Sequence, residues 1–304
     1  MSVTKVASPF DPDNEDLYRF WRDRKLKNYP TRLEDLLVDV KDPRCLSSAE
    51  YKALLQICRK TNMALYRGKT ESAPEKKIIL SVAGRFGLHQ LNNNWLADEE
   101  GVTALTIAEE GTRQEYIPYT NRPLNWHTDG YYNSRDKQIR TMLLHCVQEA
   151  ESGGENMLLD HEIVYILLRE QDPNYIRALL HDDVMSIPPR MAGKEVVRSA
   201  ESGPVFSIDA SSGNLHMRYT ARTRSIEWKE DFFTREALAY LKEILNSDSP
   251  YIFRGLLQSG MGLVSNNVLH GRSGFNDNEG HPRFLFRARY FDRIAGCDIS
   301  KQQF

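Results

Sequence analysis

The sequence predicts a mainly β fold with flanking helices, in which short strands form a sandwich or barrel. Residues 184–219 contain short β-prone pieces separated by turns of Pro, Gly and Ser, a spacing typical of such folds. Residues 139–147 and 284–291 alternate apolar and polar side chains as half-buried strands do. Helical patterns occur between these stretches, without a linker or an internal repeat. We therefore expect a single domain over residues 1–304.

Helices are predicted where apolar residues recur at helical spacing behind a capping residue. Six segments fit this description, and they are residues 14–27, 47–59, 74–86, 160–167, 174–180 and 234–245. Asn14 and Asp160 are typical N-cap residues. Ser47 and Glu50 have the spacing of a capping box, so the second helix should begin at this point.

Further strands are predicted where β-branched and aromatic residues cluster between turn residues. These strands are residues 63–68, 102–107 and 114–117. Pro123 favours an irregular approach to the residues that follow it, because proline cannot donate a hydrogen bond to a β-ladder. Gly153 and Gly154 predict a turn before residues 156–160.

Composition argues against several classes of function. The 304 residues are 40% apolar and 10% aromatic, which is enough for a packed core, and their mean hydropathy is −0.54. No uninterrupted apolar run approaches the roughly 18 residues of a membrane span. The 40 basic and 42 acidic residues give a net charge of −2, so there is no electrostatic reason to expect nucleic acid or an anionic membrane as a partner.

The N-terminus and the cysteines indicate a reducing, cytoplasmic environment. Residues 1–5 lack the apolar segment of a secretory signal, and acidic residues follow soon after them. No Cys-x-x-Cys spacing is present, so free thiols are expected at Cys45, Cys58, Cys146 and Cys297. Ferrous iron would also require such a compartment.

The run NWHTDG at residues 125–130 carries the strongest signal for chemistry. His127 and Asp129 are two positions apart, so on an extended strand both side chains would point to one face and could bind one metal ion. A third ligand must come from elsewhere, and the best candidate is His270 in the run NVLHGR. Two imidazoles and one carboxylate form the facial triad of non-haem Fe(II) oxygenases. The same ligands could hold Zn²⁺ with a bound water as a hydrolytic nucleophile.

The motifs occur along the chain in the order His127-x-Asp129, Gly153-Gly154, His270, and then Arg283 followed by Arg287. This order resembles that of the Fe(II)/2-oxoglutarate dioxygenases of the taurine dioxygenase and γ-butyrobetaine hydroxylase superfamily, over residues 126–292. The resemblance implies a double-stranded β-helix, which is a distorted jelly roll with helices packed outside and iron at its mouth.

The resemblance also implies roles for individual residues. His127, Asp129 and His270 would hold Fe(II), while 2-oxoglutarate and O₂ would take the remaining positions. Arg283 opens the strand where the family keeps an arginine that binds the C5 carboxylate of 2-oxoglutarate through two charge-assisted hydrogen bonds. Arg287 lies on the same face of that strand, as a second candidate for the cosubstrate or for an anionic substrate, or as one half of a surface ion pair.

One position departs from the family pattern. Members similar to taurine dioxygenase commonly follow the Gly-Gly turn with an acidic residue and a threonine that helps to bind the cosubstrate, whereas this chain has Glu155 and Asn156. The amide of Asn156 could donate to the same carboxylate or make a local turn bond. The family members that halogenate have a small residue in place of the carboxylate, so Asp129 favours hydroxylation or a related oxidation.

The expected reaction oxidises an unactivated C–H bond of a small molecule and releases succinate and CO₂. Candidates for the substrate pocket are Asn125, Tyr131, Tyr132 and Arg287, and arginines that could attract an anionic or amino-acid-like metabolite are Arg122, Arg140, Arg287 and Arg289. The alternatives are a non-catalytic sensor of iron and 2-oxoglutarate and a zinc hydrolase, although hydrolysis has no use for an arginine that binds 2-oxoglutarate. The sequence leaves open whether the chain forms a homo-oligomer.

The remaining histidines have no partner at ligand spacing, or lie within a predicted strand or at a helix start. We therefore do not expect metal at His89, His145, His161, His181, His216 or His281. Arg272 follows the distal histidine closely and is expected to make a structural contact or an ion pair behind it.

Overall fold

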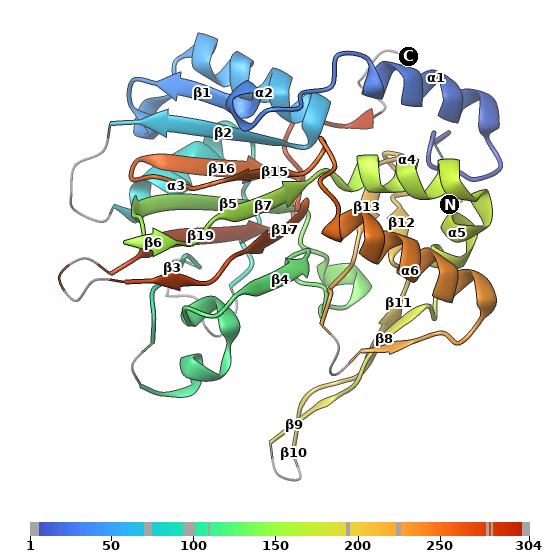
Figure 1. Ribbon diagram of the computed structural model, residues 1–304. Helices are drawn as coiled ribbons and strands as arrows, with labels where there is room; N and C mark the ends of the chain where they lie inside the picture. Colours follow the sequence, from blue (N-terminus) through green and yellow to red (C-terminus); the bar gives the residue numbers. More distant parts are fainter. Residues whose placement is uncertain are drawn as a thin grey trace.

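Two β-sheets lie at the centre of the structure, a computed structural model that describes residues 6–69, 75–93, 101–108, 110–192, 195–222, 226–277, 280 and 282–299 (Figure 1). The larger sheet has the strand order β1-β2-β16-β5-β19-β3, and the smaller has the order β15-β7-β17-β4. The larger sheet contains β1 (Leu37–Val40), β2 (Met63–Gly68), β3 (Thr103–Leu105), β5 (Thr141–Gln148), β16 (Met261–Ser265) and β19 (Phe284–Tyr290). The smaller contains β4 (Leu124–His127), β7 (Asn156–Leu159), β15 (Phe253–Gly255) and β17 (Leu269–Arg272).

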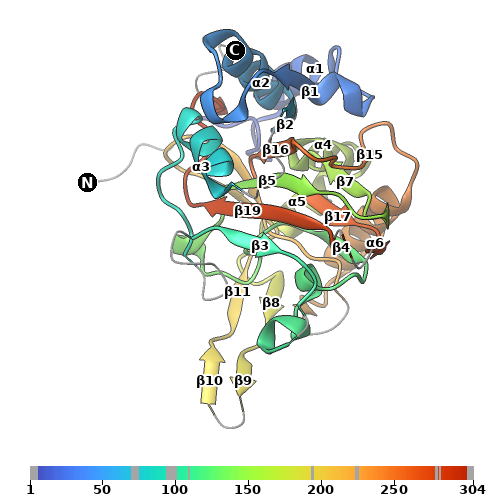
Figure 2. The same cartoon turned by 90° about the vertical axis from the view of Figure 1, so that its left-hand side faces the viewer.

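Neighbouring strands in both sheets run antiparallel, except that β1 pairs with β2 in parallel. Short strands extend this core, namely β6 (Ser152–Gly153), β8 (Met185–Ile187), β9 (Arg190–Ala192), β10 (Glu195–Arg198), β11 (Glu201–Gly203), β12 (Phe206–Ile208), β13 (Leu215–Met217), β14 (Glu227–Trp228) and β18 (Phe275–Asn276). The β9–β10 hairpin projects away from the body of the molecule (Figures 1 and 2). This arrangement is the double-stranded β-helix that the sequence analysis expected.

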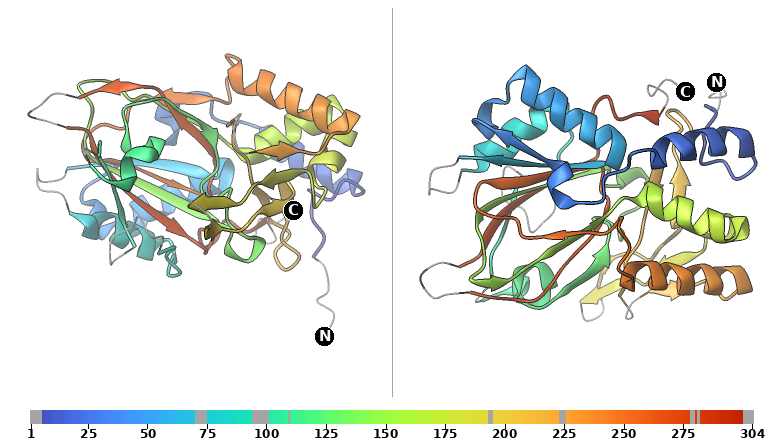
Figure 3. Two further views of the ribbon diagram at one scale, coloured as in Figure 1. Left: turned by 90° about the horizontal axis from the view of Figure 1, so that it is seen from below. Right: turned by 45° about the horizontal axis from the view of Figure 1, so that its top comes forward.

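The helices pack outside the sheets. They are α1 (Glu15–Leu26), α2 (Ser48–Thr61), α3 (Lys76–Arg85), α4 (His161–Gln171), α5 (Pro173–Leu179) and α6 (Phe232–Asn246). The side chains of Asn14, Ser47 and Asp160 accept hydrogen bonds in the first turns of α1, α2 and α4, as predicted. Ser47 and Glu50 form the complete capping box. Helices α4, α5 and α6, coloured lime and orange, lie together beside one end of the sheets (Figure 3).

Short 3₁₀ helices occupy several connections, namely η1 (Leu33–Leu36), η2 (Pro43–Cys45), η3 (Thr112–Glu115), η4 (Ile117–Tyr119) and η5 (Arg135–Lys137). The strand predicted over residues 114–117 is therefore wrong, because this segment belongs to η3 and η4. Pro118 lies in the first turn of η4, where its missing N–H is not needed. The predicted start of the third helix at Pro74 lies outside the described residues.

The larger sheet separates two hydrophobic clusters. One cluster fills the space between the two sheets and includes Leu285 of β19, whereas the other lies under α2 and α3 and includes Phe286 of the same strand. Because side chains alternate along a strand, Arg287 and Arg289 point with Leu285 into the space between the sheets. This interior face of β19 is where the site described below is found.

Two expectations about environment can be compared with the structure. Within the described ranges, none of the helices combines the length and the apolar character that crossing a bilayer would require. All four cysteines are free thiols, as predicted, with Cys45 exposed and the other three buried.

Candidate metal centre

Two histidines from different strands of the smaller sheet face each other. His127 is the last residue of β4, and His270 lies directly opposite it on β17. Directly opposed residues of antiparallel strands project to the same side of the sheet. Their imidazole rings are accordingly neighbours, with centroids 4.2 Å apart and planes inclined at 50°.

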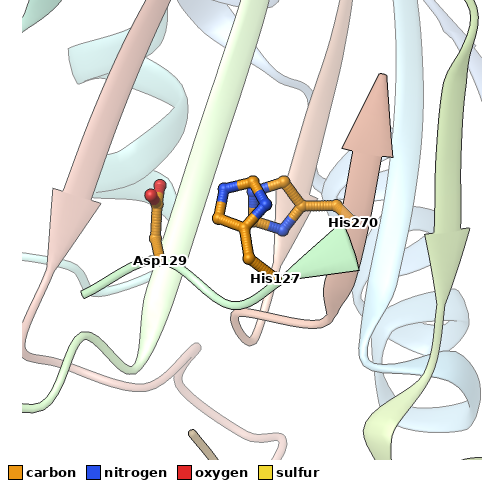
Figure 4. Close-up of side chains that lie close together, drawn as sticks. All are labelled: His127, Asp129 and His270. Carbon is orange, nitrogen blue, oxygen red and sulfur yellow. The ribbon is translucent and has the colours of Figure 1, made fainter. Parts of the chain in front are cut away.

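Asp129 joins the two histidines just beyond the end of β4. Ligand atoms of His127, Asp129 and His270 all lie within 4.8 Å of one another, and the three side chains are buried (Figure 4). In the part of the chain that the structure describes, this is the only group of three or more His, Cys, Asp or Glu residues with such spacing. The predicted convergence of three distant side chains is therefore present.

Asn267 holds the backbone on both sides of Asp129. Its Oδ1 accepts a hydrogen bond from the Asp129 amide at 2.8 Å, while its Nδ2 donates to the carbonyls of Asp129 at 2.9 Å and Ile139 at 2.6 Å. Asn267 itself adopts a left-handed conformation with φ of 50°, which asparagine tolerates better than most residues. The turn before β17 thus fixes the position of the carboxylate.

Backbone carbonyls orient both imidazoles. Nδ1 of His127 lies 2.9 Å from the carbonyl oxygen of Asn125, and Nδ1 of His270 lies 2.9 Å from that of Val268. A carbonyl only accepts, so each Nδ1 must carry the proton and each Nε2 must present a lone pair. Hydrogen bonds of this kind set the tautomer of histidines that bind metals through Nε2.

Burial and local charge keep the three groups in the ionisation states that a metal requires. Burial and the neighbouring His270 lower the pKa of His127 to about 3, and burial likewise lowers the pKa of His270. Burial alone would raise the pKa of Asp129, but Arg287 and Arg289 outweigh it and hold this pKa below its usual value. Two neutral imidazoles and one carboxylate are the result at neutral pH.

Two arginines of β19 contact only one oxygen of Asp129. Nη1 of Arg287 lies 3.3 Å and Nη1 of Arg289 lies 3.8 Å from Oδ1. The other oxygen, Oδ2, is buried and has no hydrogen-bond partner among the described residues. A buried carboxylate oxygen without a partner is costly, so this atom fits a metal ligand. The residues present therefore fit a divalent cation bound through two nitrogens and one oxygen.

A sequence model described as “Taurine catabolism dioxygenase TauD, TfdA family” matches residues 22–289. The chain belongs to this family. The match confirms the assignment made from the sequence, and with it an Fe(II)- and 2-oxoglutarate-dependent dioxygenase. It also removes the reason to consider a zinc hydrolase.

Two relatives of the dioxygenase are described as uridine-5′-phosphate dioxygenase. One, from Amycolatopsis sp, is 29% identical over 276 residues, which cover 85% of this chain and 97% of the relative. The other, from Streptomyces sp, is 32% identical over 198 residues, which cover 63% of this chain and 69% of the relative.

Solved structures share the fold of the dioxygenase. The non-haem iron oxygenase OrfP, in complex with Fe and α-ketoglutaric acid, is 16% identical with a TM-score of 0.58, over 81% of this chain and 80% of OrfP. An asparagine oxygenase in complex with Fe(II), 2S,3S-3-hydroxyasparagine and succinate is also 16% identical with a TM-score of 0.55, over 80% of this chain and 81% of that enzyme. At these identities the likeness establishes the double-stranded β-helix.

Arg283 lies just before β19 of the dioxygenase and is buried. If Gly154 carried a Cβ methyl group, that group would lie 3.6 Å from Nε of Arg283. The guanidinium of Arg283 therefore lies beside the Gly-Gly turn. Its Cζ lies 5.1 Å from the ring centre of Phe275. Among the described residues it has no hydrogen-bond acceptor. A buried guanidinium without an acceptor fits the binding of a carboxylate from a ligand.

Asn156 faces the same side of the smaller sheet as the metal centre. It lies opposite Arg272 on β17, two positions from the pair formed by Leu158 and His270. Its amide makes only a long contact of 3.5 Å with the carbonyl of Gly154. The amide therefore remains available for the role that the sequence analysis predicted.

The candidates for the substrate pocket differ in their positions. The side chain of Asn125 is exposed, and its contribution is the carbonyl that orients His127. The ring of Tyr131 stands edge-on to His127 with centroids 6.5 Å apart, and the hydroxyl of Tyr132 accepts a hydrogen bond from Arg289 at 3.0 Å. The two tyrosines thus border the centre, whereas the Asn125 side chain does not.

Three other arginines are accounted for by structural contacts. Arg272 donates to the carbonyls of Thr120 and Arg122, which is a structural contact and not an ion pair. Arg140 is partly exposed and pairs with Asp209 at 3.0 Å. Arg122 is exposed and contributes its carbonyl to Arg272. His281 lies outside the described residues.

The sequence pattern does not reveal that Asn267 positions Asp129. Replacing Asn267 with alanine should destabilise the metal-free protein by about 3 kcal/mol. The substitution leaves the amide of Asp129 and two carbonyls buried without partners. Urea denaturation of the apoprotein measures this change. Asn133→Ala is the matched control, because the side chain of Asn133 makes one hydrogen bond in the described structure, to the carbonyl of Lys137. Equal effects of both substitutions would contradict the role given to Asn267.

Proposed function

We propose that His127, Asp129 and His270 hold Fe(II) in this dioxygenase, that Arg283 and Asn156 bind 2-oxoglutarate, and that the primary substrate is a nucleoside 5′-phosphate. The convergence of two Nε2 lone pairs and the unpartnered Oδ2 of Asp129 supports the ligand assignment. The position of the Arg283 guanidinium beside the Gly-Gly turn supports the cosubstrate assignment.

An excess of buried positive charge carries the substrate proposal. Four largely buried guanidiniums lie along this interior, those of Arg272, Arg283, Arg287 and Arg289. Within the described residues, the carboxylates of Asp129 and Asp277 act electrostatically on these guanidiniums. A metal dication and a dianionic 2-oxoglutarate offset each other, so the four guanidiniums and two carboxylates of the described residues leave a net charge of about +2. Uncompensated buried charge is costly, and a phosphate dianion would offset it.

The relatives point to the same class of substrate. Both are described as acting on uridine 5′-phosphate, and the Amycolatopsis protein is matched over 97% of its length. A zwitterionic amino acid would carry no net charge into the site, so the charge balance favours the nucleotide. We therefore take uridine 5′-phosphate as the first compound to test.

The side chains of the protein bind and orient the reactants. When bound, iron and 2-oxoglutarate supply the activation of O₂ that oxidises a C–H bond and yields succinate and CO₂. Arg283 would fix the far carboxylate of 2-oxoglutarate, and Arg287 would keep Asp129 ionised. Tyr131, edge-on to His127, would limit the access of water to the centre.

Uridine 5′-phosphate should stimulate the release of succinate by the anaerobically loaded protein once O₂ is admitted. Succinate, O₂ uptake and nucleotide products are measured together, and tight coupling gives one succinate for each nucleotide oxidised. Uridine, L-arginine and L-asparagine serve as comparison substrates. Stimulation by an amino acid but not by the nucleotide would refute the proposed substrate, and a protein that binds 2-oxoglutarate without any turnover would be a sensor.

A further inference from the structure

Tyr119 is a buried tyrosine whose hydroxyl has no hydrogen-bond partner in the described part of the structure. It is the last residue of η4, and only 2% of its surface is exposed. The residue after it is joined to β17, because the carbonyl of Thr120 accepts a hydrogen bond from Nη2 of Arg272, two positions after His270, at 3.0 Å. Buried hydroxyls are normally paired, so this one fits a donor to a ligand.

The surroundings of Tyr119 are positively charged. The guanidiniums of Arg287 and Arg289 act electrostatically on its hydroxyl, and that of Arg113 stacks over its ring at 5.4 Å. Burial raises the pKa of Tyr119 despite these cations, so the phenol keeps its proton and remains a donor. Tyr132, also in electrostatic contact with Tyr119, already accepts a hydrogen bond from Arg289.

Arg287 and Arg289 each have a hydrogen-bond donor that is unpaired among the described residues. They are two positions apart on β19, so both point into the interior. Their Nη1 atoms approach Oδ1 of Asp129, but the Nε atom of each is buried without a partner in the part of the chain that the structure describes. Together with the hydroxyl of Tyr119, on which both guanidiniums act, they provide three donors from two segments that are unpaired in the described structure.

We propose that the hydroxyl of Tyr119 and the guanidinium of Arg289 join Arg287 in a subsite for the doubly charged phosphate group of the substrate. This inference rests on the proposed function and deepens it. The terminal oxygens of a phosphate monoester accept several hydrogen bonds at once, and planar guanidiniums match that geometry. The subsite would make the charge of the phosphate, rather than the base, the main determinant of specificity.

The cosubstrate does not account for these donors. Arg283 lies four positions before Arg287, and four residues of extended strand span about 13 Å. The far carboxylate of 2-oxoglutarate would bind at the Arg283 end, whereas Arg289 approaches Asp129 and acts, together with Arg287, on the hydroxyl of Tyr119. Arg283 would therefore bind 2-oxoglutarate, whereas Arg287 and Arg289 would bind the phosphate group of the substrate.

The substitution Tyr119→Phe tests the subsite, because it removes a hydroxyl that makes no hydrogen bond to any described residue. The anaerobic complex of protein, Fe(II) and 2-oxoglutarate is titrated with uridine 5′-phosphate and, separately, with inorganic phosphate. Perturbation of the visible charge-transfer band reports binding. We expect the Kd for both anions to rise about tenfold in Tyr119→Phe, as for the loss of one hydrogen bond to a charged group.

Tyr290→Phe is the matched control, since Tyr290 is a buried tyrosine of β19 that packs on the opposite face of the sheet. The Kd values of the Tyr290→Phe protein for uridine 5′-phosphate and for inorganic phosphate should equal those of the unsubstituted protein. The unsubstituted protein should also bind the monomethyl ester of uridine 5′-phosphate, which carries one negative charge, at least about tenfold more weakly than uridine 5′-phosphate.

The outcomes separate this inference from the proposed substrate. If Tyr119→Phe binds both anions as tightly as Tyr290→Phe does, or if neither anion perturbs the band, the subsite is refuted even where the nucleotide is oxidised. If inorganic phosphate binds in a Tyr119-dependent manner while uridine 5′-phosphate supports no turnover, the subsite stands and the proposed substrate is wrong.

Discussion

Replacing His270 with alanine should abolish the formation of succinate from 2-oxoglutarate, with or without a primary substrate. His270 would supply one of only two imidazole ligands, and the described residues place no other histidine within reach of His127 and Asp129. Changes to groups that merely orient a metal ligand cost about 10–100-fold, so the loss of the ligand itself should lower the rate by more than about 100-fold. Succinate yield and iron content after anaerobic loading measure the effect.

His181→Ala is the control for this substitution. His181 is an exposed histidine that pairs with Asp183 at 2.6 Å, so its removal should leave succinate formation and iron content unchanged. Normal turnover by the His270→Ala protein would exclude His270 from the ligand set. Loss of turnover with unchanged iron content would point to a different role for this imidazole.

The sequence predicted that His127 and Asp129 would converge, but the structural reason differs from the predicted one. Alternation along a strand would place residues two apart on one face, yet β4 ends at His127. Asp129 lies beyond the strand and is positioned by Asn267, which is far away in the sequence. The motif was informative because of its residue types, whereas the geometry depended on a long-range contact that spacing cannot reveal.

Helix starts were predictable because their signals act over three or four residues. Asn14, Ser47 and Asp160 cap the helices that follow them, as their positions indicated. Strands depend on partners elsewhere in the chain, so β-prone composition gave a wrong prediction at residues 114–117, where the chain forms 3₁₀ helices. The pairing of His127 with His270 also depends on distant parts of the chain, since only the sheet register brings the two rings together.

Asn267 and Tyr119 carried no recognisable signal in the sequence. Asn267 is adjacent to another asparagine in a polar turn, and its role follows from three hydrogen bonds to distant backbone. Tyr119 is one of 14 tyrosines, and only its burial beside two arginines with an unpaired hydroxyl distinguishes it. The roles of both residues depend on tertiary contacts, which local sequence patterns do not reveal.

Substitution of Arg283 by methionine should raise the KM for 2-oxoglutarate by on the order of 100-fold. A guanidinium that holds a carboxylate in two charge-assisted hydrogen bonds contributes about 3 kcal/mol, which corresponds to that factor in affinity. The fold should tolerate the change, because Arg283 has no acceptor among the described residues and the repulsion between Arg272 and Arg283 is relieved. Anaerobic titration with 2-oxoglutarate, followed by the charge-transfer band, measures affinity directly.

Arg283→Lys distinguishes recognition by geometry from recognition by charge. Lysine keeps the positive charge but presents it as a point rather than a planar fork, so its KM should fall between those of the unsubstituted protein and Arg283→Met. Arg254→Met makes the same chemical change at an exposed position of β15 and should leave the KM unaltered. If Arg283→Met bound 2-oxoglutarate as tightly as Arg254→Met, another of the interior arginines would have to bind the C5 carboxylate. Arg287 is then the next to test, because it lies on the same face of the strand.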